Sequence, residues 1–329
     1  MNILITGVHG FVGSNLVKHL SPDNTIYGLD IVAPEKEGVA RTFSWDDLES
    51  PDFPEIDAVI HLAGKAHDTR NKSAADVYFK VNTGLTQRIF DWFLARPKAS
   101  RFIFFSTVKS AADYVPGDIL TEDCVPTPVG PYGESKIKAE NYIIEHFAPE
   151  AMARPFHNFD DSDSIVPGKK VYIMRPCMIH GPGNKGNLNL LYGVVKKGIP
   201  WPLGAFENRR SFTSVGNLCV VIDGLLTKSA PSGIYHMGDD EALSTNELIA
   251  VICEAMGKKA HIWRLPKGLM NGVAKVGGWL HLPLNPLLMH KLTENYVVSN
   301  AKIKAALGID RMPVRARDGL METIRSFEQ

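Results

Sequence analysis

The sequence predicts an α/β protein in which a doubly wound parallel sheet is followed by a smaller, mixed carboxyl-terminal lobe. Three observations support this prediction. Short apolar runs alternate with segments of helical periodicity up to residue 174, as in parallel strands joined by helices. The runs are continuously apolar, which is typical of strands covered on both faces. Beyond residue 175 the alternation is lost, except for one further strand near residues 233–238 that returns to the sheet.

The first twenty residues predict a strand, a glycine turn and a helix. The turn has the spacing Gly7-x-x-Gly10-x-x-Gly13. Gly7 permits the tight turn, Gly10 lets the backbone approach a pyrophosphate, and Gly13 lets the helix pack against the strand. The phosphates would lie on the helix N-terminus, where N–H groups favour negative charge. The alternative, a glycine-rich turn without a ligand, is disfavoured because strand, turn and helix occur in the required order.

The second predicted strand, residues 25–29, ends at Asp30. A carboxylate at this place accepts hydrogen bonds from an adenosine ribose and repels a 2′-phosphate, which favours NAD over NADP. The alternative is an ordinary turn aspartate at a strand end. Residues 43–47 are expected to form a third, edge strand, which would place Asp47 near the adenine.

A continuous apolar strand, residues 58–64, ends in the small residues that would let a cofactor pass closely. His61 lies inside this strand, so we interpret it as a core histidine with satisfied hydrogen bonds rather than as a base. Further strands are expected at residues 101–106 and 171–174. Helices are expected at residues 77–96, 132–147, 187–197, 215–226, 244–256 and 315–327, and Ser244 with Glu247 predicts a capping box for the fifth of these.

The composition limits the possible partners and compartments. Lys plus Arg equals Asp plus Glu, at 36 each, and no basic stripe indicates a nucleic-acid partner. The four cysteines lack metal-ligand spacing and resemble reduced packing residues of a cytoplasmic protein. The chain begins with a core strand, so no signal peptide is expected. The acidic loop around residues 160–163 lacks the glycine and the final Glu of a calcium loop, and we interpret it as solvated.

No apolar run reaches membrane-spanning length. The most apolar segment, residues 265–289, is interrupted by lysines, glycines and prolines. We interpret this segment as a lid of the smaller lobe, with contact to a membrane surface as the alternative.

Tyr132 and Lys136 stand four residues apart, on one face of a predicted helix. An ammonium group and a cationic cofactor ring favour the phenolate, so a lowered pKa is expected for Tyr132. The phenol would then exchange a proton with a substrate oxygen. Such pairs are common, but this one follows a dinucleotide turn and a strand that ends in Ser106-Thr107. Asn82 is either a helix cap or an organiser of water or backbone near the lysine.

These motifs resemble those of an extended short-chain dehydrogenase/reductase of the nucleotide-sugar epimerase/dehydratase group, and the resemblance covers nearly the whole chain. It implies a Rossmann-type NAD-binding domain over residues 1–174 and a nucleotide-sugar-binding lobe over residues 175–329. It implies Thr107, Tyr132 and Lys136 as the catalytic residues. The residues implied for the cofactor are Gly7, Gly10, Phe11, Val12, Gly13, Asp30, Asp47, Leu62, Ala63, Gly64, Asn82, Ser106, Tyr132, Lys136 and Pro176.

In the smaller lobe, residues 181–187, 202–204 and 208–211 are similar to a bacterial subgroup of UDP-sugar 4-ketoreductases and 4-epimerases. This resemblance implies that Asn187 and Arg210 hold the substrate diphosphate and that Thr107 positions the reacting oxygen. Arg209 is expected to face solvent. Met178 stands where classical 4-epimerases carry an asparagine, which favours a reductase.

The resemblance therefore implies an NAD(H)-dependent oxidoreductase acting at C4 of a UDP-hexose. The favoured activity is a 4-keto-sugar reductase of the UDP-N-acetylquinovosamine-forming type. The alternatives are a UDP-sugar 4-epimerase with tightly held NAD and, in another class, a non-catalytic NAD-binding regulatory protein. A 4,6-dehydratase is disfavoured, because no Asp-Glu pair follows Thr107. A cytoplasmic homodimer is expected by analogy, paired through the helices at residues 84–96 and 132–147.

Overall fold

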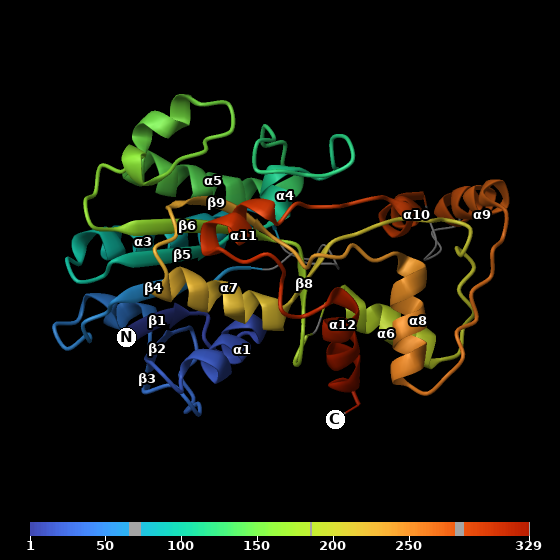
Figure 1. Ribbon diagram of the computed structural model, residues 1–329, viewed down its shortest axis with the longest axis horizontal. Coiled ribbons are helices and arrows are strands. Elements are labelled where there is room, and N and C mark those ends of the chain that lie inside the picture. The colour runs from blue at the N-terminus through green and yellow to red at the C-terminus, as the bar shows by residue number, and fades with distance from the viewer. Residues whose placement is uncertain (66–73, 185, 280–285, 329) are drawn as a thin grey trace.

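The computed structural model describes residues 1–65, 74–184, 186–279 and 286–328. Seven strands form one parallel sheet in the order β3-β2-β1-β4-β5-β6-β9 (Figure 1). The doubly wound fold predicted from the sequence is thereby confirmed. The strands are β1 (Asn2–Thr6), β2 (Thr25–Leu29), β3 (Arg41–Phe43), β4 (Ala58–His61), β5 (Arg101–Phe105), β6 (Lys170–Pro176) and β9 (Gly233–Met237).

The order of the strands reverses beside β1. From β1 the chain runs outward to β2 and β3, and it then returns to β4 on the opposite side of β1. Thr6, the last residue of β1, is paired with Leu29 on one side and His61 on the other. In such sheets a ligand lies in the crevice outside the carboxyl ends of the strands, at the point of reversal.

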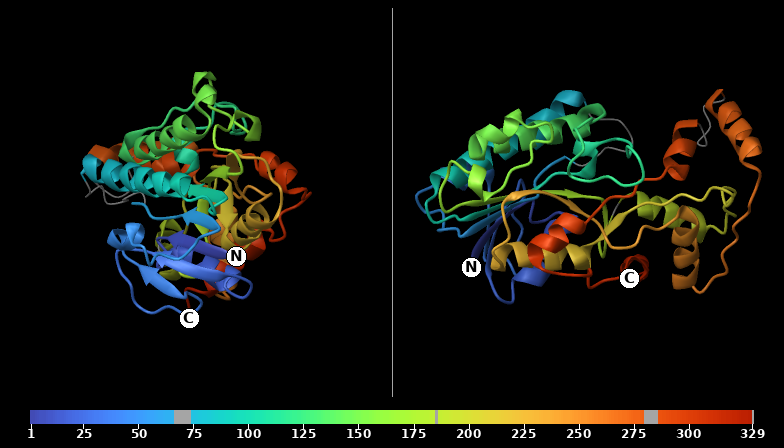
Figure 2. Two further views of the ribbon diagram at one scale, coloured as in Figure 1. Left: turned by 90° about the vertical axis from the view of Figure 1, so that its left-hand side faces the viewer. Right: turned by 45° about the horizontal axis from the view of Figure 1, so that its top comes forward.

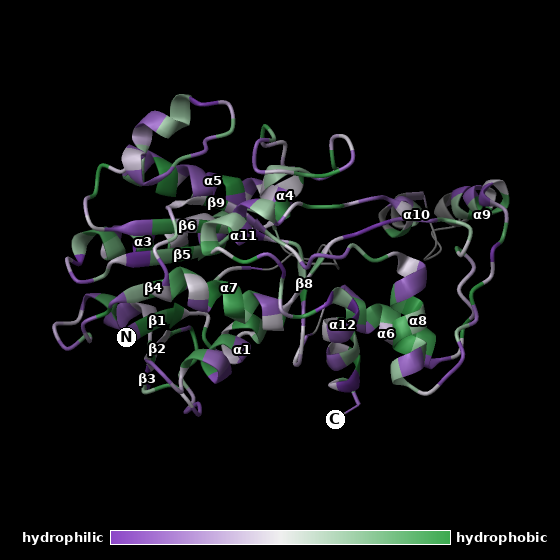
Figure 3. Ribbon diagram, in the orientation of Figure 1, coloured by the Kyte–Doolittle hydropathy of each residue, from purple (hydrophilic) through white to green (hydrophobic). Residues whose placement is uncertain are grey.

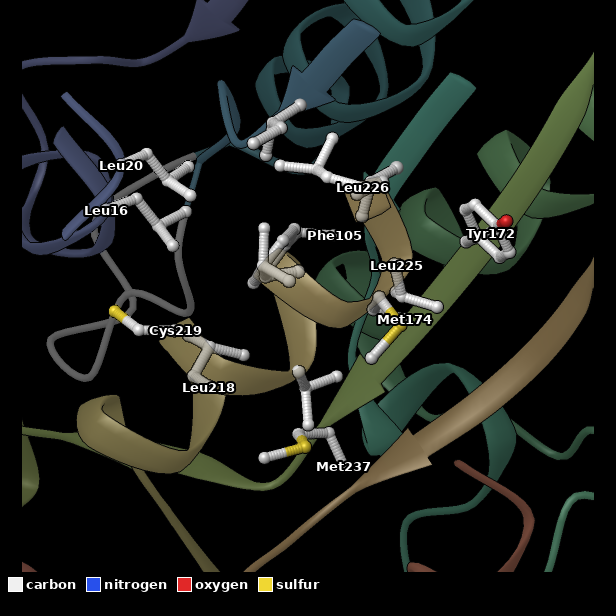
Figure 4. Close-up of a cluster of buried hydrophobic side chains, with 14 of the residues drawn as sticks. Leu16, Leu20, Phe105, Tyr172, Met174, Leu218, Cys219, Leu225, Leu226 and Met237 are labelled. Carbon is white, nitrogen blue, oxygen red and sulfur yellow. The ribbon is translucent and has the colours of Figure 1, made fainter. Parts of the chain in front are cut away.

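Helices cover both faces of the sheet, and successive strand residues serve opposite faces. Ile3 and Ile5 join one apolar core, while Leu4 between them joins the other. The first core, part of which is drawn in Figure 4, lies under α1 (Phe11–Leu20), α7 (Val215–Thr227) and α11 (Ala301–Leu307). The second lies under α3 (Leu85–Ala95) and α5 (Gly130–Phe147). Helices therefore shield both faces of the sheet from solvent, and this is why the strands are continuously apolar.

The smaller lobe extends from the carboxyl ends of the sheet (Figure 2). Its parallel pair β7 (Met178–His180) and β8 (Phe212–Ser214) adjoins α12 (Ala316–Arg325), and a third core joins α12 to α6 (Asn187–Lys196) and α8 (Thr245–Ala255). Figure 3 shows the apolar residues of α6 and α8 where these helices meet. The predicted capping box of α8 is confirmed, with Ser244 and Glu247 capping each other. Two further helices, α9 (Lys267–Trp279) and α10 (Pro286–Thr293), lie at the end of the lobe farthest from the sheet.

Two predicted elements differ from the structure. The edge strand ends at Phe43, and Ser44 caps a 3-10 helix, η1 (Trp45–Glu49), because Ser44 and Asp47 form a capping box. The helix expected at residues 77–96 is divided into α2 (Ala75–Tyr78), a π-helical segment η2 (Phe79–Gly84) and α3. A π-helical turn adds a residue and turns side chains, including that of Asn82, to new directions.

The loop between α5 and β6 contains two short 3-10 helices, η3 (Pro149–Ala153) and η4 (Asp161–Asp163). Its acidic side chains form ion pairs and hydrogen bonds with other residues of the same chain. Asp163 forms an ion pair with Arg154, Asp161 pairs with Lys170, and Asp161 also accepts a hydrogen bond from Ser232 N at 3.0 Å. These contacts attach the loop to the segment that leads into β9.

All four cysteines are free thiols. Among the residues that the structure describes, no helix has both the length and the apolar character needed to cross a membrane.

Candidate active site

The glycine turn between β1 and α1 is so tight that its glycine positions have no room for a side chain. Gly7 has a φ of +69°, and its N–H donates to Leu29 O at 2.9 Å. A Cβ at Gly13 would lie 2.5 Å from Gly7 O, and a Cβ at Gly7 would lie 3.0 Å from Ala63 N. The turn therefore contacts the segment that follows β4. It also leaves the first N–H groups of α1 without partners inside the helix, as an anion site requires.

Asp30 lies over this turn. One carboxylate oxygen accepts a hydrogen bond from His9 N at 3.1 Å, and the other accepts from Ile31 N at 2.8 Å. The side chain is half-buried at the end of β2. This is the place where a ribose diol bound along the turn would meet a carboxylate.

Asp47 has a structural role that was not predicted from the sequence. Its Oδ2 accepts hydrogen bonds from Ser44 N and Ser44 Oγ, both at 2.8 Å, and these bonds lower the pKa of Asp47. The carboxylate thus caps η1. A contact with the adenine remains a prediction.

His61 is a core histidine, as predicted. Thr86 Oγ1 donates to Asn82 O at 2.6 Å, so it accepts from His61 Nε2 at 2.9 Å. Thr6 Oγ1 accepts from Ala63 N at 2.9 Å and therefore donates to His61 Nδ1 at 2.7 Å. Burial lowers the pKa of His61 well below its ordinary value, which agrees with a neutral ring. This chain of bonds fixes the ends of β1 and β4 to α3.

Asn82 is buried in η2 and is not a helix cap. Its Oδ1 accepts from Lys65 N at 2.7 Å, and its Nδ2 donates to Ser135 Oγ at 3.0 Å. It therefore joins the backbone after β4 to α5. A Cβ at Gly64 would lie 3.0 Å from Asn82 Oδ1 and 3.2 Å from Lys136 Nζ, so the predicted neighbourhood of Asn82 and the lysine is observed.

Lys136 and Tyr132 occupy one face of α5, and Thr107 follows the end of β5 opposite them. Lys136 Nζ donates to Phe105 O at 2.7 Å, and burial lowers the pKa of Lys136 to about 8. The Thr107 hydroxyl lies near the phenol of Tyr132 and by itself lowers the pKa of that phenol, although burial outweighs this effect. The structure thus brings the three predicted catalytic residues together at the carboxyl end of the sheet.

The expected lowering of the Tyr132 pKa is wrong for the protein alone. Burial is the largest influence, and it raises the pKa of Tyr132, with a smaller contribution from Tyr78. The ammonium of Lys136 is directed to the Phe105 carbonyl, and it does not offset this effect. The phenol therefore keeps its proton at neutral pH.

Ser106 and Thr107 point to different environments, because adjacent residues of an extended chain alternate in direction. Ser106 Oγ donates to Glu140 in the protein interior. Its side chain is therefore engaged beneath the crevice, and the proposed cofactor contact of Ser106 remains a prediction. Thr107, by contrast, meets Tyr132.

The sequence analysis missed a buried ion pair beneath the site. Arg175 Nε donates to Glu140 Oε2 at 3.0 Å and Nη2 donates to the same oxygen at 2.5 Å, and both side chains are at most 1% exposed. Glu140 Oε1 also accepts from Ser110 Oγ at 2.5 Å. Glu140 lies one turn beyond Lys136 on the same face of α5. A single carboxylate among the apolar positions of that face was the feature of the sequence that could have indicated a buried ion pair.

The chain crosses into the smaller lobe beside the glycine turn. Pro176 ends β6 and is buried. A Cβ at Gly181 would lie 3.6 Å from the ring of Phe11, and Asn15 Nδ2 donates to Pro182 O at 3.0 Å. The start of α1, with Phe11 and Val12, therefore packs against this crossing.

The predicted substrate residues lie on separate elements of the smaller lobe. Asn187 is exposed as the first residue of α6. Arg210 is half-buried, and its guanidinium lies 3.7 Å from Glu294. Arg209 is exposed, as predicted, and Met178 in β7 is 38% exposed. Joint binding of a diphosphate by Asn187 and Arg210 remains a prediction.

Gly13→Ala is expected to raise the Kd for NAD at least about tenfold, because the added methyl group would force the turn apart. Isothermal titration calorimetry measures this change. Gly193→Ala in α6 is the matched control, since a Cβ there would meet no atom within 4 Å. Equal affinity of the two variants would contradict the proposed phosphate site.

Comparison with known proteins gives concordant results. The model of the NAD dependent epimerase/dehydratase family matches residues 3–238. The chain is 28% identical to a UDP-glucose 4-epimerase of Vibrio cholerae, covering 100% of this chain and 96% of the relative. It is 26% identical to the N-acetyl-alpha-D-glucosaminyl-diphospho-ditrans,octacis-undecaprenol 4-epimerase of Escherichia coli O157:H7. That alignment covers 92% of this chain and 84% of the relative. The solved structure of MoeE5 in complex with UDP-glucuronic acid and NAD superposes on this chain with a TM-score of 0.72 at 21% identity. The superposition covers 100% of this chain and 99% of the MoeE5 chain.

Proposed function

Because the chain belongs to the NAD dependent epimerase/dehydratase family, we propose that it is an oxidoreductase acting at C4 of a UDP-linked hexose. The observation that carries this proposal is the proximity of Thr107 to the phenol of Tyr132 at the carboxyl end of the sheet, one helical turn from the buried ammonium of Lys136. A phenol and a hydroxyl that meet beside a dinucleotide crevice are suited to bind and protonate one oxygen atom.

The residues at the strand ends fit NAD. The turn has no room for a side chain at Gly7 or Gly13, and it presents the start of α1 to phosphate. Asp30 is positioned beside that turn for a ribose diol. When NAD is bound, its nicotinamide exchanges a hydride with the substrate carbon.

The protein groups would control the oxygen attached to that carbon. Tyr132, which burial keeps protonated, would donate its proton to a C4 carbonyl oxygen. Thr107 would hold the same oxygen through its hydroxyl. Lys136 would add positive charge beside the phenolate that remains and would bind the nicotinamide ribose. Met178 stands where classical 4-epimerases carry an asparagine, so we propose a 4-keto-sugar reductase, of the UDP-N-acetylquinovosamine-forming type.

A UDP-sugar 4-epimerase is the second candidate. It is favoured by the end-to-end similarity to the Vibrio cholerae UDP-glucose 4-epimerase. In this activity Tyr132 would first remove the proton of the C4 hydroxyl and later return it, while the protein retains NAD throughout. Release of cofactor between turnovers therefore separates the two candidates.

The purified protein should be denatured and the supernatant assayed for NAD. A reductase is expected to carry little cofactor and to consume one NADH for each 4-keto sugar. An epimerase is expected to release nearly one NAD per chain and to interconvert UDP-hexose C4 epimers without added NADH. Cofactor binding without turnover of any UDP-sugar would favour the regulatory alternative.

For the reductase, kcat/KM for NADH is expected to decrease as the pH rises through about 8. This parameter reports groups of the free enzyme. Lys136, whose pKa is lowered to about 8 by burial, carries its charge below that pH and loses it above. The corresponding Lys136→Met profile should be lower and should lack this step. A wild-type profile that is flat between pH 7 and 9 would contradict the role of the ammonium.

Three expectations remain predictions. They are the pairing of two copies through α3 and α5, the location in the cytoplasm, and the domain boundary at residue 174. Light scattering of the purified protein tests the first of them.

A further inference from the structure

Helix α9 turns a row of apolar side chains away from the protein. Leu269, Val273 and Val276 share one face at spacings of four and three residues, and they are 46–55% exposed. Trp279, three residues further on, is 80% exposed. On the inner side of α9, Met270 and Ala274 are buried in a core with Leu203 and Met289 of the smaller lobe. The helix therefore attaches to the lobe through one face and leaves a second apolar face outward.

No described residue covers this outer face. A Cβ at Gly268 or Gly272 would meet no atom within 4 Å. Figures 1 and 2 place α9 at the extreme end of the smaller lobe, away from the sheet and from α3 and α5. Residues 280–285, which belong to the segment interpreted above as a lid, lie outside the described residues. Only the inner face of α9 packs on residues 201–206, and its outer face does not contact them.

The surrounding chain is strongly basic. Between Glu254 and Glu294 there are six Lys or Arg residues and no Asp or Glu, although the whole chain has 36 of each kind. Arg264, Lys267 and Lys275, before and within α9, are exposed. This end of the molecule is thus a local positive region in a chain with no net charge.

We propose that α9 docks the protein on a membrane surface rich in anionic phospholipids. An exposed apolar row with tryptophan and flanking lysines is the pattern of a helix that lies in the lipid–water interface. Leu269, Val273, Val276 and Trp279 enter the acyl boundary, and the cations bind phosphate headgroups. With 13 residues the helix is about 20 Å long, too short for the roughly 30 Å hydrocarbon core, so it lies along the surface.

A second copy of this chain fits the face less well. Symmetric pairing would bring the same basic regions together. Because no acidic residue between Glu254 and Glu294 would neutralise them, such a pair would be opposed by its own charge.

Flotation of the full-length protein with unilamellar vesicles tests the proposal. Vesicles of phosphatidylcholine alone are compared with vesicles containing 30% phosphatidylglycerol, at low and high salt. The wild type is expected to bind the anionic vesicles at least about tenfold better and to be released by salt. Val276→Gln with Trp279→Gln is expected to lower binding at least about tenfold, and so is Arg264→Glu with Lys275→Glu.

Tyr114→Gln is the matched control, because Tyr114 is also an exposed aromatic residue, at 64%, but lies in the loop after α4 (Val108–Ala111). Tyr114→Gln should bind the vesicles as the wild type does. All variants should have the same midpoint of thermal unfolding. Equal binding of the wild type and the α9 variants, or no binding to anionic vesicles, would overturn the proposal. Self-association that is reversed by Trp279→Gln would likewise overturn it and assign the face to a second copy. Turnover of a soluble UDP-sugar is measured separately, so the two proposals fail independently.

Discussion

Tyr132→Phe is expected to lower kcat by about 10²- to 10⁴-fold, the usual contribution of a positioned proton donor. The substitution removes the hydroxyl that faces Thr107 and keeps the ring that packs against Tyr78, with centroids 6.3 Å apart. The fold and the affinity for NAD should therefore be preserved. Steady-state assays on the UDP-sugar substrate, with NAD binding measured by calorimetry, check both parts of this prediction.

Tyr142→Phe on the same helix is the matched control. The Tyr142 hydroxyl donates to Asp91 at 2.7 Å in an exposed position, so its loss should leave kcat within about threefold of the wild type. Equal activities of Tyr132→Phe and Tyr142→Phe would remove Tyr132 from the chemistry. Thr107→Val should fall between them, because it retains the proton donor and loses the group that positions the oxygen.

Arg175→Met is expected to lower the free energy of unfolding by about 3–5 kcal/mol, since it leaves the Glu140 carboxylate buried without its cation. Glu140 is completely buried, and its remaining partners are neutral hydroxyl groups of Ser106 and Ser110. Urea denaturation of the full chain measures the change. The double variant, Arg175→Met with Glu140→Leu, should regain part of the loss because the Glu140 carboxylate no longer has to be buried without Arg175.

Glu55→Gln provides the comparison for this buried pair. Glu55 and Lys98 form an ion pair of 2.8 Å with exposed side chains, and solvent screening leaves such surface pairs with little effect on stability. If Arg175→Met costs no more than Glu55→Gln, the buried network does not hold α5 against β5. A loss of kcat in Glu140→Gln that exceeds its effect on KM would show that the network also positions Thr107.

Local patterns in the sequence were sufficient for much of the fold. The glycine turn, the strand at residues 25–29 and the capping box of Ser244 with Glu247 each depend on residues within a few positions of one another. Backbone conformation, capping and strand burial are decided largely at that range. The same reasoning failed at residues 43–47, where Ser44 and Asp47 formed a cap in place of a strand.

The contacts that make the candidate site were decided by the tertiary structure. From the sequence, Asn82 had two alternative roles, and only the packing of η2 against α5 selected its bonds to Lys65 and Ser135. The direction of the Tyr132 pKa depends on burial and on where the Lys136 ammonium points, and neither follows from their spacing.

The sequence by itself determined the parallel sheet, the dinucleotide turn and the placing of Tyr132 and Lys136 on one helical face, because these follow from periodicity and from steric rules acting along the chain. Only the tertiary structure decided that Ser106 turns inward to Glu140, that Glu140 is neutralised by Arg175, and that α9 has an apolar face that no described residue covers. Each of these depends on groups that are distant in the chain, and burial, which sets both the cost of a charge and the exposure of an apolar side chain, exists only once the elements have packed.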